Sequence, residues 1–388
     1  MSSFGRPRLF AVVSPAMLLT HTRSRGVASV SEQNAGEASE VNVSTRREFV
    51  KAAVLTAAAS GTSLLAEDHA TPVRNQAFSQ MRGFNYQPSY GSCGFEIWQN
   101  FEPITFEKEL GQGKQLFPRI GAIRLWLSWD SFIRSPARFK ERFDRALQCA
   151  SSNQLAVMPV LFNRWHDYTL DYGGIYIDQI LLDSADRHNL FQQYLEEVVG
   201  NHADDKRIFA WDLCNEPMLT NLTHSWTATF RDAEYAWLED VYQSCKQLGA
   251  KASLCVSTVP TLADAVLVEP ISDILAIHPY WIPNSFTKSA YEKQLDSYVE
   301  LANRTNKPLL ATETCWGSLD DKERVQIIRY TLGELKSRGI GWLAYLLHFS
   351  LIADAHGADS GPVGSPGNLS FIQKDGTLRP GHEIFNDY

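Results

Sequence analysis

Short apolar runs alternate with amphipathic stretches of helical spacing from residue 81 to near the end of the chain. Such alternation is typical of βα units, whose parallel strands form a sheet covered by helices. Eight candidate strands occur in this part of the chain: Met81–Tyr86, Ala122–Leu127, Ala156–Phe162, Ile208–Leu213, Ala252–Ser257, Ile274–Ile277, Pro308–Thr312 and Gly341–Leu346. Eight such units predict an α/β fold of the (β/α)8 TIM barrel type, as a single domain over residues 78–388.

Amphipathic stretches between these runs predict helices at Arg138–Ser152, Asn189–Gly200, Ala233–Leu248, Tyr291–Thr305 and Asp320–Ser337. The last of them opens on Asp320 and carries Lys336 near its end, in agreement with the direction of the helix dipole. Gly121, Gly249 and Gly339 stand where a helix gives way to the next strand, so we expect them to act as C-terminal caps.

The composition limits the class of protein. The 388 residues are 44% apolar and 21% charged, which suits a globular protein with a large core. A net charge of −8 argues against a nucleic-acid-binding surface, which needs clustered Lys and Arg. The six cysteines have neither CxxC spacing nor the density of a disulfide scaffold, so we expect mostly reduced, structural thiols. A disulfide that involves Cys93 stays open.

The first 70 residues differ in character from the rest. Residues 44–70 contain Arg46 and Arg47, then Phe49 and Lys51, then an Ala-rich stretch. This pattern resembles the twin-arginine export signal of bacteria and predicts export to the periplasm, the cell surface or the medium. Residues 1–43 are expected to be a disordered extension or the result of a start codon placed too early. No segment reaches 18 apolar residues, so no integral membrane segment is expected.

Two glutamates stand at the ends of predicted strands. Glu216 stands three residues after the predicted strand Ile208–Leu213, and Glu313 directly follows the predicted strand Pro308–Thr312. Barrels of this kind gather their chemistry at the C-terminal ends of the strands. Cleavage of a glycosidic bond needs one neutral acid, which protonates the leaving oxygen, and one ionised carboxylate. The two glutamates therefore predict a carbohydrate-cleaving catalytic domain.

The Asn215-Glu216-Pro217 triplet and the Thr312-Glu313 end resemble the catalytic strands 4 and 7 of clan A glycoside hydrolases. Within the clan, the chain is most similar to glycoside hydrolase family 5, the cellulase- and mannanase-like enzymes, or a close relative. The resemblance implies that Glu216 is the acid/base, Glu313 the nucleophile and Asn215 a ligand of the sugar 2-hydroxyl. An acid at neutral pH needs a raised pKa, and we expect the charge of Glu313, about 5–5.5 Å away, to raise it.

The same resemblance implies three supporting residues. Arg124, inside an apolar strand, would brace Glu313, because a buried Arg is costly unless it is paired. Tyr280 would donate a hydrogen bond to Glu313, and His278, two residues earlier, would orient the site.

Substrate contacts are predicted near the same strand ends. Asn163 and His166 both qualify as the polar residue that clan members often carry after strand 3, and the sequence does not choose between them. Four tryptophans that follow strands 2, 3, 6 and 7 are candidate platforms for sugar rings: Trp129, Trp165, Trp281 and Trp316.

Strand 8 departs from the family pattern. Family 5 enzymes usually place a Trp near its C-terminal end, where this chain has Leu346 to His348, whereas Trp342 stands earlier. His348 is therefore a further candidate for contact with substrate.

The sequence predicts a retaining β-glycoside hydrolase that cleaves a β-linked polysaccharide or oligosaccharide with no metal or organic cofactor. A transglycosylase on the same fold and a carbohydrate-binding pseudoenzyme are alternatives. A metal-dependent barrel hydrolase is a third, although His166 and the acids near it match no compact ligand motif. The sugar, the mode of attack and the oligomeric state stay open.

Overall fold

The computed structural model describes residues 77–164, 185–217, 228–258, 261–285, 287–355, 363–364 and 366–388. The predicted extension (1–43) and export signal (44–70) lie outside these residues, and so do Trp165 and His166. Among the helices of the described ranges, none is long and apolar enough to cross a membrane.

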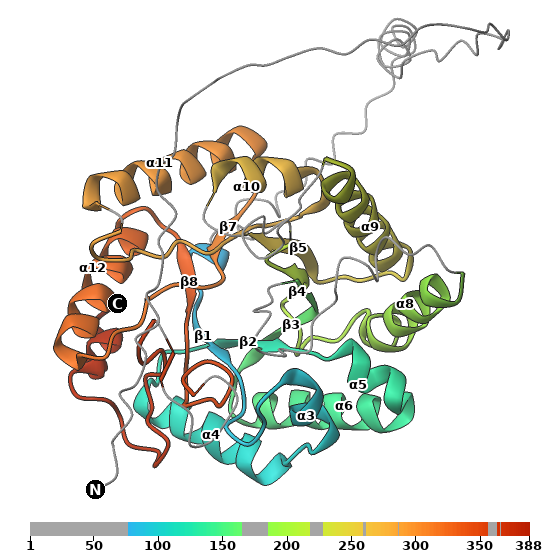
Figure 1. Cartoon of the computed structure of the whole chain (residues 1–388), viewed down its shortest axis with the longest axis horizontal. Helices are drawn as coiled ribbons and strands as arrows, with labels where there is room; N and C mark the ends of the chain where they lie inside the picture. Colours follow the sequence, from blue (N-terminus) through green and yellow to red (C-terminus); the bar gives the residue numbers. More distant parts are fainter. Residues whose placement is uncertain are drawn as a thin grey trace, which may run out of the picture. The chain divides into compact units, whose positions relative to one another are not determined.

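Eight parallel strands close into a barrel in which each strand pairs with the next in sequence and β8 pairs with β1 (Figure 1). The strands are β1 (Arg82–Tyr86), β2 (Ala122–Trp126), β3 (Ala156–Asn163), β4 (Ala210–Asn215), β5 (Ser253–Thr258), β6 (Leu275–Ile277), β7 (Leu309–Ala311) and β8 (Gly341–Ala344). All eight predicted strands are confirmed, with ends that differ by at most two residues. The predicted (β/α)8 barrel is therefore correct.

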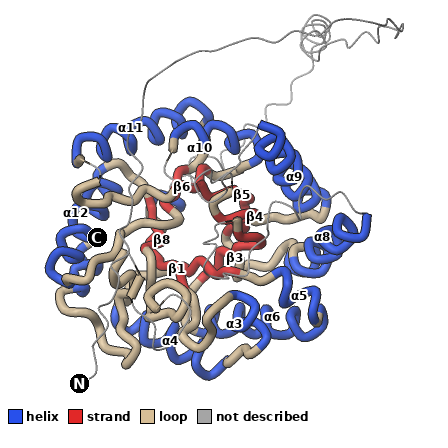
Figure 2. The backbone as a smooth tube through the Cα atoms, in the orientation of Figure 1, coloured by secondary structure: helices blue, strands red, loops and turns tan. Residues whose placement is uncertain are grey.

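Helices surround the strands on the outside of the barrel (Figure 2). They are α3 (Gly94–Gln99), α4 (Pro103–Leu116), α5 (Trp129–Arg134), α6 (Pro136–Ser152), α8 (Ala185–Val198), α9 (Ala228–Gln247), α10 (Leu262–Val268), α11 (Lys288–Thr305) and α12 (Asp321–Ser337). Short 3-10 helices are η1 (Gly200–His202), η2 (Glu269–Ile271) and η3 (His382–Asp387). The five predicted helices correspond to α6, α8, α9, α11 and α12. Helix α4, whose Gly111 and Gly113 lower its helix propensity, was not predicted, and neither were the short helices α3, α5 and α10.

Two of the three predicted glycine caps adopt the left-handed conformation. Gly249 follows α9 with a φ of 82°, and Gly339 follows α12 with a φ of 66°. The prediction for Gly121 is wrong. Its φ is not positive, and its N–H donates to the carbonyl oxygen of Arg82 at 2.9 Å, so it extends the ladder between β1 and β2.

The core has an inner and an outer part. The inner cluster fills the barrel with Phe78, Ala122, Met158, Ala210, Cys255, Ile274, Ala276, Leu310 and Leu343. These residues lie in the first three positions of their strands or before them, so apolar packing occupies the N-terminal half of the barrel. The C-terminal half is left for polar side chains, as is usual for this fold. The outer cluster packs the strands against the helices and contains the buried thiols of Cys149, Cys214, Cys245 and Cys315, whereas the buried Cys255 belongs to the inner cluster.

Candidate active site

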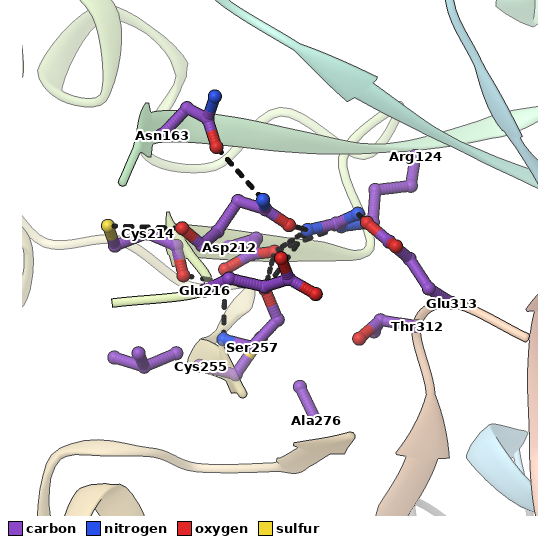
Figure 3. A network of polar contacts seen from close by, with 12 residues as sticks. Arg124, Asn163, Asp212, Cys214, Glu216, Cys255, Ser257, Ala276, Thr312 and Glu313 are labelled. Atoms are coloured by element: carbon purple, nitrogen blue, oxygen red, sulfur yellow. Dashed lines mark hydrogen bonds and ion pairs between the residues drawn. The ribbon is translucent and has the colours of Figure 1, made fainter. Parts of the chain in front are cut away.

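Arg124 stands at the centre of a buried polar network at the C-terminal ends of the strands (Figure 3). Its Nη1 donates to Glu313 Oε1 at 2.6 Å, and its Nη2 donates to Asp212 Oδ2 at 2.7 Å. The guanidinium also donates to Asn85 Oδ1 at 2.9 Å and to Asn215 Oδ1 at 2.6 Å. Burial alone would lower the pKa of Arg124, but the charges of Asp212 and Glu313 outweigh burial and raise it. Arg124 is therefore a permanent cation.

Asp212 on β4 is a partner that the sequence analysis missed. It is fully buried, and its Oδ2 also accepts a hydrogen bond from Ser257 Oγ at 2.7 Å. The register between β4 and β5 shifts between Asp212 and Asn215, so both side chains reach the guanidinium of Arg124. A signal was present, because an Asp and an Arg inside two apolar strands must each find an opposite charge.

Glu313, which follows β7, has donors at both carboxylate oxygens. Oε1 accepts from Arg124, and Oε2 accepts from the hydroxyl of Tyr280 at 2.8 Å. Burial, and then the charge of Glu313, raises the pKa of Tyr280 well above its usual value, so Tyr280 keeps its proton and acts as a donor. Hydrogen bonds to a carboxylate favour its ionised form.

Glu216, which follows β4, lies in a different environment. Its backbone has a φ of 46°, and its N–H donates to the carbonyl oxygen of Ser257 at 3.0 Å. Burial raises the pKa of Glu216 to about 7; the charge of Asp212 adds to this, and that of Arg124 opposes it. The expected rise is present, but its main cause is burial, and not the charge of Glu313 that the sequence analysis proposed.

His278 lies between the two carboxylates. Its Nδ1 is 2.7 Å from Glu216 Oε1 and 3.6 Å from Glu313 Oε2. Burial lowers the pKa of His278 to about 4, so the ring is neutral near pH 7. Nε2 is buried and has no hydrogen-bond partner among the described residues, so the proton is better placed on Nδ1, where it donates to Glu216. This arrangement leaves the other oxygen of Glu216 to carry a proton when the carboxyl group is neutral.

Glu216, His278 and Glu313 each offer one possible ligand atom, and these atoms lie within 4.8 Å of one another. The donor set is of a kind that binds metals. However, Arg124 already places a positive charge 2.6 Å from Glu313, and Tyr280 takes up the second oxygen. A further cation would have to compete with both donors.

A cavity of about 290 Å³ opens above these groups. It is lined by Tyr86, Gln87, Pro88, Gly94, Ile97, Leu125, Trp126, Leu127, Asn163, Asn215, Glu216, Tyr280, Glu313, Trp316, Tyr345, Ile352, Ala353, Pro366 and Leu369. The predicted residues Asn163, Asn215, Glu216, Tyr280, Glu313 and Trp316 thus share one cavity. Of the two candidates after strand 3, Asn163 lines the cavity and accepts a hydrogen bond from Asn215 Nδ2 at 2.9 Å.

Three residues predicted to contact substrate lie elsewhere. Trp129 is buried in α5 and packs on Phe191, with ring centroids 4.6 Å apart. Trp281 packs on Tyr330 at 4.5 Å. His348 is buried, with Nδ1 3.6 Å from Glu109 Oε1. Their rings fill space between elements instead of facing the cavity.

The tip of strand 8 carries Tyr345, whereas Leu346 to His348 were predicted there. β8 ends at Ala344, two residues earlier than predicted, and the next residue, Tyr345, lines the cavity. Trp342 is fully buried on the other side of the strand, with the guanidinium of Arg82 3.5 Å above its ring. Gln87 and Trp126 also line the cavity, and neither was predicted from the sequence.

Comparison with known proteins identifies the family. The family model of Cellulase (glycosyl hydrolase family 5) matches residues 118–350, more than half of the chain. The chain belongs to glycosyl hydrolase family 5.

Individual curated relatives share only low sequence identity with this chain. Probable mannan endo-1,4-beta-mannosidase A of Aspergillus clavatus is 24% identical over 182 residues, which cover 44% of this chain and 48% of the relative. The matches to the first curated relatives span 29%, 32% and 48% of their lengths.

Solved structures of other proteins share the fold. GH5_18 from Streptomyces cattleya, in complex with GlcNAc, has a TM-score of 0.61 at 14% identity, over 79% of each chain. The exo-beta-1,4-mannosidase Op5Man5 from Opitutaceae bacterium strain TAV5 has a TM-score of 0.60 at 18% identity, over 79% of this chain and 58% of that one.

Proposed function

We propose that the protein is a retaining β-glycoside hydrolase in which Glu216 is the acid/base and Glu313 the nucleophile. The supporting observation is that the two neighbouring carboxylates have opposite environments. Glu216 is buried with a pKa of about 7, so much of it is protonated near neutral pH. Glu313 accepts hydrogen bonds from a permanent cation and from a tyrosine hydroxyl. One acid and one ionised carboxylate are the pair that glycoside cleavage requires.

The reaction would follow from these positions. Glu313 attacks the anomeric carbon while Glu216 gives its proton to the leaving oxygen, which yields a glycosyl ester on Glu313. Glu216, now ionised, removes a proton from water, and the resulting hydroxide releases the sugar with its original configuration. Carboxyl groups about 5–5.5 Å apart favour this route, whereas inverting enzymes need about 6.5–9.5 Å. One carboxylate oxygen of Glu216 lies within 4.8 Å of one carboxylate oxygen of Glu313, and this short distance supports the retaining route.

A β-1,4-linked mannoside is the substrate we propose first. The curated relatives carry the name mannan endo-1,4-beta-mannosidase, and one solved structure is an exo-beta-1,4-mannosidase. The cavity suits a sugar because Trp126, Trp316 and Tyr345 offer ring faces, while Asn163 and Asn215 offer amides.

The test is hydrolysis of aryl β-mannosides, aryl β-glucosides and mannan by the wild type, Glu216→Ala, Glu313→Gln and the exposed control Glu383→Gln. We expect activity in the wild type and the control only, with retained anomeric configuration by NMR. Azide should restore turnover of Glu216→Ala on an activated aryl glycoside and give a β-glycosyl azide, because azide needs no general base. Full activity of Glu313→Gln would refute the mechanism.

The two alternatives make different predictions in the same assay. A transglycosylase would yield longer oligosaccharides from mannan fragments, with little free sugar. A pseudoenzyme would bind glycans without turnover. The matched acid and nucleophile argue against a purely binding role, which requires neither.

A further inference from the structure

The cavity has two chemically different sides. Strands β3, β4, β6 and β7 contribute the polar groups already described. The opposite side comes from the neighbouring strands β8, β1 and β2 and from the segments that follow them. Its aliphatic lining consists of Pro88, Ile97, Leu125, Leu127, Ile352, Ala353, Pro366 and Leu369. A sugar ring that presents a hydroxyl to this side would meet few polar partners.

The two tyrosine hydroxyls on this side are already engaged. Tyr86 donates to Glu109 Oε2 at 2.7 Å, behind the cavity wall. Tyr345 donates to Gln87 Oε1 at 3.3 Å. Neither hydroxyl proton is therefore directed to a ligand.

Gln87 differs from the two tyrosines because it offers a donor group that can bind a ligand. The side chain lines the cavity and is only 7% exposed. Its Oε1 accepts from Tyr345 and also from Ser350 Oγ at 3.4 Å. Ser350 Oγ itself accepts the N–H of Ile352 at 3.1 Å, so the serine proton is the one that reaches Gln87. Two donors occupy the carbonyl oxygen, and this leaves the amide NH2 as the group that can bind a ligand.

The position of Gln87 is fixed from both flanks. Tyr86 and Ser89 both donate to the buried carboxylate of Glu109, which is 3% exposed on α4. The turn that carries Gln87 is thereby attached to a helix outside the barrel. A donor held in place before binding loses little conformational entropy when the ligand arrives.

We propose that Gln87 is a specificity-determining residue, whose amide nitrogen donates a hydrogen bond to a sugar hydroxyl remote from the cleaved bond. The proposal rests on the proposed function. Glu216 and Glu313 fix the anomeric carbon near β4 and β7, and in a closed barrel of eight strands β8 and β1 lie opposite β4 and β5. Gln87 therefore meets the far end of the ring, which carries the hydroxyls at C3, C4 and C6. The ligand is a glycoside whose first ring is unsubstituted at one of these hydroxyls.

The experiment pairs variants of Gln87 with substrates that lack one hydroxyl. The substrates are 4-nitrophenyl β-D-mannoside or β-D-glucoside, whichever the wild type hydrolyses, and their 3-, 4- and 6-deoxy analogues. Gln87→Leu removes the amide at similar size. Gln87→Glu keeps an acceptor for Tyr345 and Ser350 but loses the donor. Gln148→Leu, exposed on α6, is the control.

We expect Gln87→Leu and Gln87→Glu each to lower kcat/KM for the parent glycoside by about tenfold, the size of one buried hydrogen bond. For one deoxy analogue, kcat/KM of the wild type should be about tenfold lower than for the parent glycoside. Neither variant should lower kcat/KM for that analogue any further. An equal loss for the parent and all three analogues, or no loss, overturns the proposal. Loss in Gln87→Leu but not in Gln87→Glu also overturns it, because Gln87 would then act only through Tyr345.

Failure of the proposed function is recognised separately. If the wild type hydrolyses neither aryl glycoside, the same sugars are tested as ligands by calorimetry, and the hydrolase assignment fails if mannan is not hydrolysed either. The Gln87 contact is supported if the Gln87 variants bind the parent glycoside and two of the deoxy analogues more weakly than the wild type does, but bind the third analogue equally well. Equal affinities in the wild type and Gln87→Leu overturn it.

Discussion

Arg124 is shared by two carboxylates, Asp212 and Glu313, that are almost entirely removed from water. Removing one partner of a buried ion pair is expensive because the remaining charge keeps its desolvation cost. Here a single side chain neutralises two anions. Replacement of Arg124 therefore disturbs both the stability of the barrel and the hydrogen bonding of the proposed nucleophile.

We expect Arg124→Met to lower the free energy of unfolding by about 3–5 kcal/mol. kcat/KM should fall by about 100-fold or more, since a donor to the reacting carboxylate is lost. Urea denaturation and hydrolysis of an aryl glycoside measure the two effects. Arg145→Met is the matched control, because Arg145 makes an exposed ion pair with Glu107 and should change stability by less than about 1 kcal/mol. Unchanged stability of Arg124→Met would contradict the account of the network.

The pKa of Glu216 leads to a prediction for stability. Its folded-state pKa of about 7 lies above the ordinary value of 4.5, so between these pH values the folded state binds more protons than the unfolded state. Stability from this group is complete below pH 4.5, declines as pH rises to about 7 and is lost above it. Glu216→Gln removes this titration. The stability of Glu216→Gln relative to the wild type should therefore increase between pH 4.5 and pH 8, as measured by urea denaturation. A difference that stays constant with pH would show that burial does not perturb Glu216.

The sequence predicted several site residues because each stands at the end of an apolar run, where a parallel barrel collects functional groups. Glu216, Glu313 and Tyr280 are of this kind. Asp212 reaches Arg124 only because of a register shift between β4 and β5, and such a shift leaves no clear pattern in the sequence. Gln87 was missed because its partners Tyr345 and Ser350 are 258 and 263 residues away.

The segment after β8 is organised around a buried carboxylate. Asp354 is 1% exposed, and it accepts hydrogen bonds from the backbone N–H groups of Ser350, Leu369 and Ser370 at 3.2, 2.8 and 3.2 Å. Arg324 of α12 holds the same segment from the other side by donating to the carbonyl oxygens of Tyr345, Leu369 and Ser370. This segment supplies Ile352, Ala353 and Leu369 to the cavity.

Asp354→Ala should leave three buried N–H groups without an acceptor. We expect a loss of about 2–4 kcal/mol in the free energy of unfolding and a KM raised more strongly than kcat is lowered, because the cavity wall loosens while the two glutamates stay in place. Asp375→Ala is the control, since Asp375 is exposed and accepts hydrogen bonds from Thr377 in the same turn. Equal effects of the two substitutions would show that Asp354 does not hold the segment.

At the scale of elements, the strands could be predicted because a fully buried strand has a continuous run of apolar residues in its sequence. The helices with a clear apolar stripe were predicted for a similar reason. Helices α3, α4 and α5, which follow β1 and β2, were not. Their sequences are short or interrupted by glycine, and they take their conformation from packing against the barrel.

Closure of the barrel brings together two carboxylates from distant parts of the chain, and it places Arg124 beside them. Many hydrolases use a bound metal to supply positive charge at such a point. In this protein the guanidinium of Arg124 is bonded to Glu313 and Asp212, and it remains charged at every accessible pH.

We therefore expect dialysis of the whole protein against EDTA to change neither kcat/KM nor Tm, and added Zn²⁺, Mn²⁺ or Ca²⁺ to raise neither. Elemental analysis of the dialysed protein confirms that metal has been removed, and a known zinc hydrolase treated in parallel shows that the chelation is effective. A cation that bound Glu216, His278 and Glu313 would sit close to the guanidinium of Arg124 and would have to displace the hydroxyl of Tyr280 from Glu313 Oε2. Activity that falls with EDTA and returns with one of these ions would show that the three side chains bind a metal after all, and that Glu313 serves as a ligand instead of a nucleophile.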